Sequence, residues 1–277
     1  MRWFLRLLVL VLLAALGVAG YGYWSATREP VVREAKVQLR AWPKNQRPLR
    51  LLLMSDIHVQ GPDMRPSRLL EIVQQANALA PDIILLAGDF IGDKQLGTRT
   101  YSAEEMAAPL AALEAPLGRF AVLGNHDHWN NAPAVRAALT GVGIRVLVNE
   151  AARAGPLAIG GVDDDHTSRS DLGRTLVAMQ MAGGLPILLS HSPDPFPALP
   201  EDVPLMLAGH THCGQIRLPG IGPLATASRH GKRYACGRID ERGRSLIVSA
   251  GLGTSVLPFR IGAPPDMWLI ELGPAVR

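Results

Sequence analysis

Five clusters of polar residues that can bind metal ions follow short apolar runs along the chain. Together they supply three carboxylate or amide oxygens and four imidazoles, the mixture of ligands that a binuclear site for divalent transition metals uses. Taken singly, each cluster is an ordinary strand end or turn, so the prediction depends on all of them occurring in order. The clusters are Asp56-Ile57-His58, Gly88-Asp89, Gly124-Asn125-His126-Asp127, Ser190-His191 and Gly209-His210-Thr211-His212.

Apolar runs and helical periodicities alternate from Leu49 onward, and this alternation predicts an α/β domain. An amphipathic helix is expected at 68–79, and Ser102 with Glu105 forms a capping-box pattern that opens another helix, which Pro109 must kink or shorten. The carboxyl ends of strands gather at one edge of an open α/β sheet, so ligands about 150 residues apart can meet. Strands are expected at 49–54, 82–87, 119–123, 144–148, 157–161, 186–190, 203–208, 245–249 and 267–272.

An uncharged N-terminal segment, residues 7–27, follows two arginines. About 20 such residues suffice to span a hydrocarbon core, whereas a shorter apolar core with small residues after it also suits a cleavable signal peptide. Tyr21, Tyr23 and Trp24 favour an uncleaved anchor, because aromatic side chains accumulate at the headgroup level. Both interpretations remain open at this point.

The chain is expected to divide into three parts: an anchor or signal segment at 1–27, a juxtamembrane linker at 28–48 with room for one edge strand at 31–39, and a catalytic domain at 49–277. A short N-terminal segment of this type normally leaves its tail in the cytoplasm. We therefore expect a single-pass protein of a bacterial cytoplasmic membrane, with its domain on the extracytoplasmic side.

The charge balance argues against a nucleic-acid partner. The formal net charge is +4, from 28 basic and 24 acidic residues, and the chain without residues 1–30 carries 25 basic and 23 acidic residues. A nearly neutral body lacks the concentrated basic face that nucleic-acid binding requires. Two cysteines, Cys213 and Cys236, are too few for a disulfide framework and lack the spacing of a structural zinc site.

With its five motifs in order, the sequence resembles the calcineurin-like metallophosphoesterases over residues 49–272. This resemblance implies a four-layer αββα sandwich, here preceded by one N-terminal transmembrane or signal helix. Cys213 departs from the most similar group, which usually has glycine there. That group is the membrane-associated bacterial branch of the YkuE and YaeI proteins, and the residues that indicate it are Gln215-Ile216, Leu218-Pro219, Gly251-Leu252-Gly253 and Pro258-Phe259-Arg260.

The resemblance implies a centre of two divalent metal ions, with manganese expected and iron or zinc as alternatives. A carboxylate shared by both ions would offset their mutual repulsion, and a hydroxide between them would be a nucleophile at neutral pH. The implied ligands, in two sets that share Asp89, are Asp56, His58, Asp89 and His212 for the first ion and Asp89, Asn125, His191 and His210 for the second.

The implied reaction is hydrolysis of a phosphomonoester or phosphodiester, in which His126 protonates the leaving alcohol. Asp93 follows Asp89 by four residues, whereas some relatives orient this histidine with an aspartate three residues on, so the role of Asp93 is open. Arg260 is a candidate for contact with the substrate phosphate, or else for a structural ion pair. A lipid-linked phosphoester is one candidate substrate, because the site is tethered near a membrane.

Several polar residues near the motifs have a structural interpretation. Asp127 is expected to cap the following loop or helix, His128 to lie at the surface or behind the ligands, and the acidic run at 163–166 to form a surface loop. Cys213 and Cys236 can pair if the domain is exported. Two other functions remain open: a metallo-β-lactamase-like hydrolase, suggested by the histidines at 126 and 128, and a membrane-tethered interaction module without catalysis.

Overall fold

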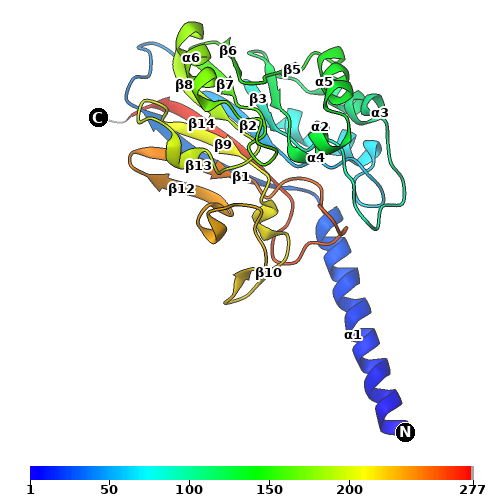
Figure 1. The fold of residues 1–277 in the computed structure, drawn as a ribbon. Helices are drawn as coiled ribbons and strands as arrows, with labels where there is room; N and C mark the ends of the chain where they lie inside the picture. Colours follow the sequence, from blue (N-terminus) through cyan, green and yellow to red (C-terminus); the bar gives the residue numbers. More distant parts are fainter. Residues whose placement is uncertain (276–277) are drawn as a thin grey trace.

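Two mixed six-stranded sheets form the centre of the body in the computed structural model, which describes residues 1–275 (Figure 1). The strand order of the first sheet is β1-β14-β2-β3-β4-β5, and all of its strands except β1 coincide with apolar runs that the sequence indicates. The bounds are β1 (Val31–Leu39), β14 (Asp266–Pro274), β2 (Leu49–Met54), β3 (Ile83–Ala87), β4 (Arg119–Val122) and β5 (Arg145–Val146).

The second sheet has the order β12-β13-β9-β8-β7-β6. Its two edge strands, β12 and β6, were not predicted, because their sequences carry few apolar residues, as is common at sheet edges. The bounds are β12 (Gly237–Glu241), β13 (Arg244–Val248), β9 (Leu205–Ala208), β8 (Leu185–Leu189), β7 (Leu157–Gly161) and β6 (Glu150–Ala154).

Helices cover the outer faces of both sheets, so the layers follow the order αββα. Strand β2 shows why: Leu51 packs in the apolar core between the sheets, whereas Leu52 faces the helices. A central strand buried on both faces reads as a continuous apolar run. The helices are α2 (Pro66–Ala78), α3 (Ala103–Ala107) and α5 (Ala132–Gly141) on the first sheet and α6 (Leu172–Ala182) on the second. The expected fold class is confirmed.

The capping box predicted at Ser102 and Glu105 is present. The Ser102 hydroxyl accepts from the Glu105 amide at 3.1 Å, and the Glu105 carboxylate accepts from the Ser102 amide at 2.9 Å. Helix α3 ends at Ala107 and continues as a 3-10 turn that contains Pro109, as the proline requires. The short elements are α4 (Asn125–Asn130), β10 (Arg217–Leu218), β11 (Gly222–Pro223) and the 3-10 turns at Ala108–Ala112, Phe196–Ala198, His212–Gly214 and Gly231–Tyr234.

Helix α1 (Arg2–Thr27) extends away from the body (Figure 1). It is the one helix among the described residues that is long and apolar enough to cross a membrane, and its most apolar stretch makes no buried contact. Its last turns do touch the body, where Gly22, Ser25 and Ala26 are buried. The helix therefore changes from exposed to docked near Gly22.

Residues 28–48 contain the edge strand that we expected at 31–39. This strand, β1, pairs in parallel with β14 along its whole length at the edge of the first sheet, so the segment is less of a free linker than expected. Alternate side chains of β1 such as Val37 and Leu39 join the core between the sheets. The body thus follows α1 almost directly, because burial of these side chains stabilises β1 in the sheet.

Candidate metal centre

Five neighbouring strands place the predicted ligands at one edge of the two sheets. Strand β2 ends just before Asp56, β3 just before Asp89, β4 just before Asn125, β8 just before His191, and β9 just before His210. Within each sheet these strands are parallel to one another, so their carboxyl ends meet.

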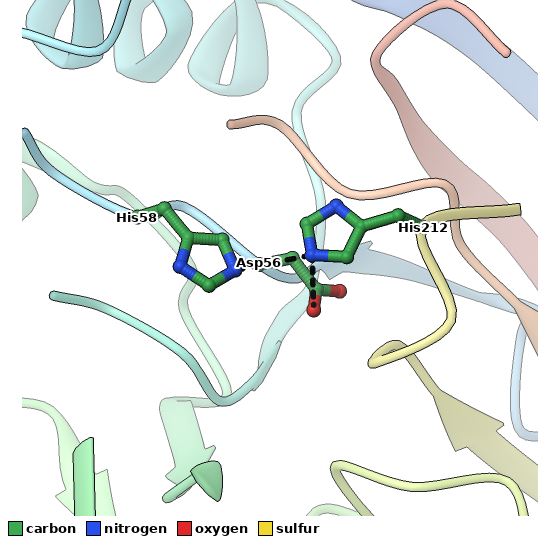
Figure 2. Close-up of side chains that lie close together, drawn as sticks. All are labelled: Asp56, His58 and His212. Atoms are coloured by element: carbon green, nitrogen blue, oxygen red, sulfur yellow. Dashed lines mark hydrogen bonds and ion pairs between the residues drawn. The ribbon is translucent and has the colours of Figure 1, made fainter. Parts of the chain in front are cut away.

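One group of ligands comprises Asp56, His58 and His212 (Figure 2). The Nε2 atoms of His58 and His212 lie 3.1 Å apart, and His212 Nε2 lies 3.4 Å from Asp56 Oδ1. His58 Nε2 is also 3.5 Å from Asp89 Oδ2. All three side chains are buried.

A second group gathers around His191. Its Nε2 lies 3.1 Å from Asn125 Oδ1, 3.0 Å from His210 Nδ1 and 3.2 Å from Asp89 Oδ2. The same Asp89 oxygen approaches His58 in the first group. Asp89 therefore lies between the two groups.

The protonation of His191 and His210 suits metal binding. His191 Nδ1 lies 2.7 Å from the Ala87 carbonyl, and His210 Nε2 lies 3.0 Å from the Ala227 carbonyl. Carbonyls accept, so these nitrogens carry hydrogens, and each opposite nitrogen presents a lone pair once it holds no proton of its own, which a binding metal ion displaces. Those lone pairs converge with the oxygens of Asn125 and Asp89, an arrangement that a divalent cation satisfies. The donor set therefore fits the implied metals.

Burial keeps three of the histidines neutral. It lowers the pKa of His58 and of His212 well below the ordinary value, and it lowers the pKa of His210 to about 3. The Arg260 guanidinium beside His212 acts in the same direction. Neutral imidazole is the form that binds metals.

The carboxylates respond differently to the same burial. Burial raises the pKa of Asp56 to about 6. Burial would raise the pKa of Asp89 too, but the neighbouring His191 holds it well below the usual range. In return, Asp89 raises the pKa of His191 to about 10 against the effect of burial. The cluster thus attracts positive charge strongly.

Glycines allow the backbone to come close to these carboxylates. Gly88 has a φ of 82°, and Asp89 after it has a φ of 55°, so the turn after β3 needs a residue without a side chain. Gly124 and Gly209 are needed for another reason, because a side chain at either position would collide with a ligand carboxylate. A Cβ at Gly124 would lie 2.2 Å from Asp89 Oδ1, and one at Gly209 would lie 2.3 Å from Asp56 Oδ2.

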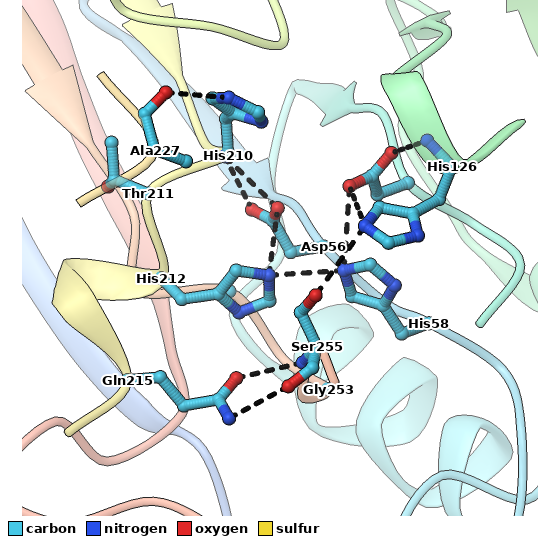
Figure 3. Close-up of polar contacts among 12 residues, drawn as sticks. Asp56, His58, His126, His210, Thr211, His212, Gln215, Ala227, Gly253 and Ser255 are labelled. Carbon is cyan, nitrogen blue, oxygen red and sulfur yellow. Dashed lines mark hydrogen bonds and ion pairs between the residues drawn. The ribbon is translucent and has the colours of Figure 1, made fainter. Parts of the chain in front are cut away.

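His126 lies beside the two groups and faces the pocket (Figure 3). Its Nε2 is 4.0 Å from Asp89 Oδ2 and 3.5 Å from the Ser255 hydroxyl, and its Nδ1 is 2.6 Å from Asp93 Oδ1. Burial would lower the pKa of His126, but Asp93 and Asp89 raise it. The open question about Asp93 is thereby answered, because its carboxylate pairs with His126.

Asp127 caps the start of α4, as predicted. Its buried carboxylate accepts from the amides of Gly124 at 2.9 Å, Asp89 at 2.9 Å and Phe90 at 2.8 Å. These bonds join the loop after β3 to the loop after β4. Asp127 thereby fixes the position of the backbone that carries Asp89.

Arg260 does not occupy the position that substrate contact requires. Its side chain is fully buried, and its guanidinium donates to the carbonyls of Gly253 at 3.0 Å, Ala263 at 3.0 Å and Ala250 at 2.7 Å. Burial lowers its pKa to about 10. Enclosed by these oxygens, Arg260 holds together the loop behind His212. The expected contact with a substrate phosphate is therefore wrong, because the guanidinium is not exposed to the pocket.

The acidic run at 163–166 is a loop, as we expected, but only its second half lies at the surface. Asp163 and Asp164 are buried, and Asp163 Oδ1 lies 2.8 Å from His128 Nε2. His166 reaches the pocket, where its ring lies 5.0 Å from that of His210. The sequence signalled the polar run, but the direction of each side chain depends on how the loop folds back over β7.

Two further residues near the site were missed. Trp129 stacks edge-on against His126 with ring centroids 4.9 Å apart, and it lines the pocket. Lys94, fully buried, donates to the carbonyl of His58 at 2.9 Å and lies 3.4 Å from Asp63. A lone tryptophan and a lysine in a loop carry no pattern that distinguishes them in a sequence.

The pocket above the ligands has a volume of about 490 Å³. Its polar base, which we call the pocket floor, consists of Asp89, Asn125, His126, His210 and His212. Its apolar margin, which we call the pocket rim, consists of Trp129, Ile216, Leu224, Val256 and Leu257.

A disulfide joins Cys213 to Cys236. Cys213 directly follows His212, and Cys236 lies just before strand β12. The bond thus ties the segment after the last ligand to the second sheet, next to a small apolar cluster that includes Ala250 and Ala263.

The fold and the site together define the class of this protein. Residues 49–214 match the family of calcineurin-like phosphoesterases, and the chain belongs to that family. The family match excludes the metallo-β-lactamase-like alternative, which had been suggested by His126 and His128. His128 pairs with Asp163 and is in none of the metal-ligand clusters found among residues 1–275.

Relatives with membrane segments and bacterial relatives both match almost the whole chain. A transmembrane protein with metallophosphoesterase domain from Danio rerio is 30% identical over 96% of this chain, which spans 63% of the length of that relative. The uncharacterized metallophosphoesterase YkuE of Bacillus subtilis is 30% identical over 91% of this chain and 90% of its own length. Phosphodiesterase YaeI of Escherichia coli is 30% identical over 92% of this chain and 93% of its own length.

Proposed function

We propose that the protein hydrolyses phosphoester bonds with two divalent metal ions shared through Asp89. The observation that carries the proposal is the position of one oxygen: Asp89 Oδ2 lies 3.5 Å from His58 Nε2 and 3.2 Å from His191 Nε2. The ligands are Asp56, His58, Asp89 and His212 for the first ion and Asp89, Asn125, His191 and His210 for the second.

When bound, the two ions supply Lewis-acid activation of water and neutralise charge on the phosphoryl oxygens. Imidazole, carboxylate and amide ligands in this proportion suit manganese, iron or zinc, and we propose manganese. Asp127 and the buried Lys94 hold the loops that carry Asp89 and His58 in place. These loops keep the ligands in position before substrate arrives.

His126 is the proposed general acid. Asp93 holds its Nδ1, so Nε2 is the atom that faces the pocket. A proton on Nε2 passes to the oxygen of the departing alcohol, which forms as the bond from phosphorus to that oxygen breaks. Trp129 packs against the ring and restricts its rotation.

The proposed substrate is a phosphodiester or phosphomonoester that carries an apolar group, such as a lipid-linked phosphoester. The apolar pocket rim lies beside the polar floor, so an ester with one charged and one apolar end fits both. The relative YaeI is named a phosphodiesterase, which favours a diester.

We further propose that α1 is a single-pass anchor in a bacterial cytoplasmic membrane and that the domain lies outside the cytoplasm. The disulfide between Cys213 and Cys236 supports this side, because disulfides persist in oxidising compartments. A reporter fused after Arg277 tests the orientation: activity of a periplasmic reporter is expected, and activity of a cytoplasmic reporter alone would overturn it.

Metal analysis combined with activity profiling tests the proposed reaction. The full chain in detergent, loaded with manganese, is expected to hold two ions and to hydrolyse a diester with an apolar group faster than a soluble nucleotide. Asp202→Ala, an exposed turn residue, is the matched control for loss of a carboxylate. One ion or fewer per active chain would overturn the shared site, and a metal-loaded chain inactive on all esters would favour an interaction module.

A further inference from the structure

We propose that the β10–β11 hairpin is a second membrane contact, which places the pocket rim at the surface of the bilayer. We call residues 218–224 the hairpin tip. The inference rests on α1 as a membrane anchor, but it does not depend on the proposed reaction.

Helix α1 sets the level of the bilayer relative to the body. Its exposed part, from Arg2 to Tyr21, is about 30 Å long at about 1.5 Å per residue, enough to cross a hydrocarbon core when the side chains of Arg2 and Arg6 extend to the far headgroups. Beyond it, Gly22 accepts from the Arg260 amide at 2.9 Å, and Ala26 accepts from Arg68 at 2.9 Å. The membrane surface therefore falls where the helix meets the body.

The hairpin starts close to that junction. Ile216 pairs with Ile261, and the Arg217 amide donates to the Ile261 carbonyl at 2.7 Å. Ile261 is the neighbour of Arg260, whose amide binds Gly22 of α1. Figure 1 shows the hairpin projecting from the same side of the body as α1. The hairpin tip thus points toward the bilayer.

The side chains of the hairpin tip suit a lipid interface. Ile221 and Leu224 are each 59% exposed, and Leu218 is 37% exposed, in a turn of only a few residues. Lys232 donates to the Ile221 carbonyl at 2.9 Å, so a positive charge stands next to the apolar tip. Aliphatic side chains beside a basic residue bind membranes that contain anionic lipids. In water, the exposed apolar surface of the tip has an unfavourable free energy, which burial in the bilayer would remove.

The hairpin tip is continuous with the pocket rim. Leu224 belongs to both, and Val256, 51% exposed, lies across the pocket from it. Gln215 joins the two sides, because its amide donates to the carbonyls of Ser255 at 2.9 Å and Leu257 at 3.1 Å. With the tip in the interface, a phosphoester in the headgroup layer enters the pocket without leaving the membrane.

Fluorescence quenching in vesicles tests the contact without any activity measurement. The full chain is reconstituted in vesicles of phosphatidylethanolamine and phosphatidylglycerol, with an environment-sensitive non-native amino acid at Ile221. Met181 is the matched control, because it is exposed and belongs to α6, which lies at the end of the body away from α1 (Figure 1). Quencher-bearing lipids are expected to quench position 221 severalfold more than 181, and aqueous iodide the reverse.

Two results would overturn the proposal. Equal access of iodide to both positions would place the tip in water, and protection of position 221 from both quenchers would place a second protein copy on it.

As a second measurement, Leu218→Ser with Ile221→Ser should lower hydrolysis of a vesicle-borne phosphoester severalfold more than of a soluble diester, whereas Val177→Ser with Met181→Ser should change neither. Equal effects of both pairs contradict the contact, and inactivity of every chain contradicts the proposed reaction alone.

Discussion

The pocket floor and the pocket rim lie side by side but are built in opposite ways. The floor is polar, buried and carried on the ends of central strands, where His210 and Asp89 adopt positive φ values. The rim is apolar, partly exposed and carried on the end of α4, the β10–β11 hairpin and the loop around Val256. Left-handed backbone also occurs in the rim, at Val256, but in the floor the sheet enforces it at the ends of central strands.

This difference separates two parts of the function. The floor holds the groups that act on a phosphoester, and their positions follow from the sheet. The rim decides which esters reach the floor and from where. Substitutions in the floor should therefore change activity on every substrate, whereas substitutions in the rim should change the preference among substrates.

Asp89→Ala should have the largest effect, because this carboxylate alone lies in both groups of ligands. We expect a loss of activity on all esters on the order of 10³-fold or more, since a central electrostatic group is removed. Metal content, measured on the purified chain after manganese loading, should fall below two ions. Full activity of the variant would contradict the shared ligand, and Asp202→Ala should behave as the wild type.

His126→Ala tests the floor without removing a proposed ligand. We expect turnover to fall by about 10²–10⁴, the range for loss of a general acid, while metal content stays at the wild-type value. An ester with a very acidic leaving alcohol should lose much less, because its departure needs no proton. Loss of metal together with activity would show that His126 is a ligand instead.

Asp93→Asn should lower activity less, because Asp93 acts only through His126, whose Nδ1 lies 2.6 Å from Asp93 Oδ1. Loss of such a supporting partner costs about 10–100-fold. The loss should appear in kcat with little change in KM, and Asp93→Glu should restore part of it. A change confined to thermal stability would assign Asp93 a purely structural role.

The floor could be predicted from the sequence because each of its residues directly follows an apolar strand. The period of the pattern gives the strand, and the parallel arrangement brings the ends of β2, β3, β4, β8 and β9 together. The bounds of β2 and β7 agree with the sequence because both strands are short, largely apolar runs. Which oxygen lies between the two groups required the structure.

The rim could not be predicted, since its residues come from a short helix, a small hairpin and irregular loops, which carry no periodic pattern. Arg260 illustrates the difficulty: an arginine near a phosphate site suggests a phosphate contact, but the surrounding carbonyls bury it. His166 illustrates the reverse, because a polar run that suggested a surface loop places a ring in the pocket. Such outcomes depend on how loops fold back, which local sequence does not determine.

Substitution of Val256 should give the smallest effect and probes strain in the rim. Val256 has a φ of 63°, a conformation that costs a β-branched residue about 1–3 kcal/mol. Asn tolerates this conformation, so Val256→Asn should raise Tm by about 2–4 °C for each kcal/mol relieved. Because an apolar rim residue is lost, the ratio of the rates on a lipid phosphoester and a soluble diester should fall.

Val256→Thr separates the two effects, because threonine keeps the β-branch and therefore the strain while adding a polar group. Its Tm should stay at the wild-type value, and its rate ratio should fall as it does for Val256→Asn. Thermal unfolding in detergent and paired assays measure both quantities. A lower Tm for Val256→Asn would show that the valine is favourably packed, and an unchanged rate ratio in both variants would remove the rim from substrate selection.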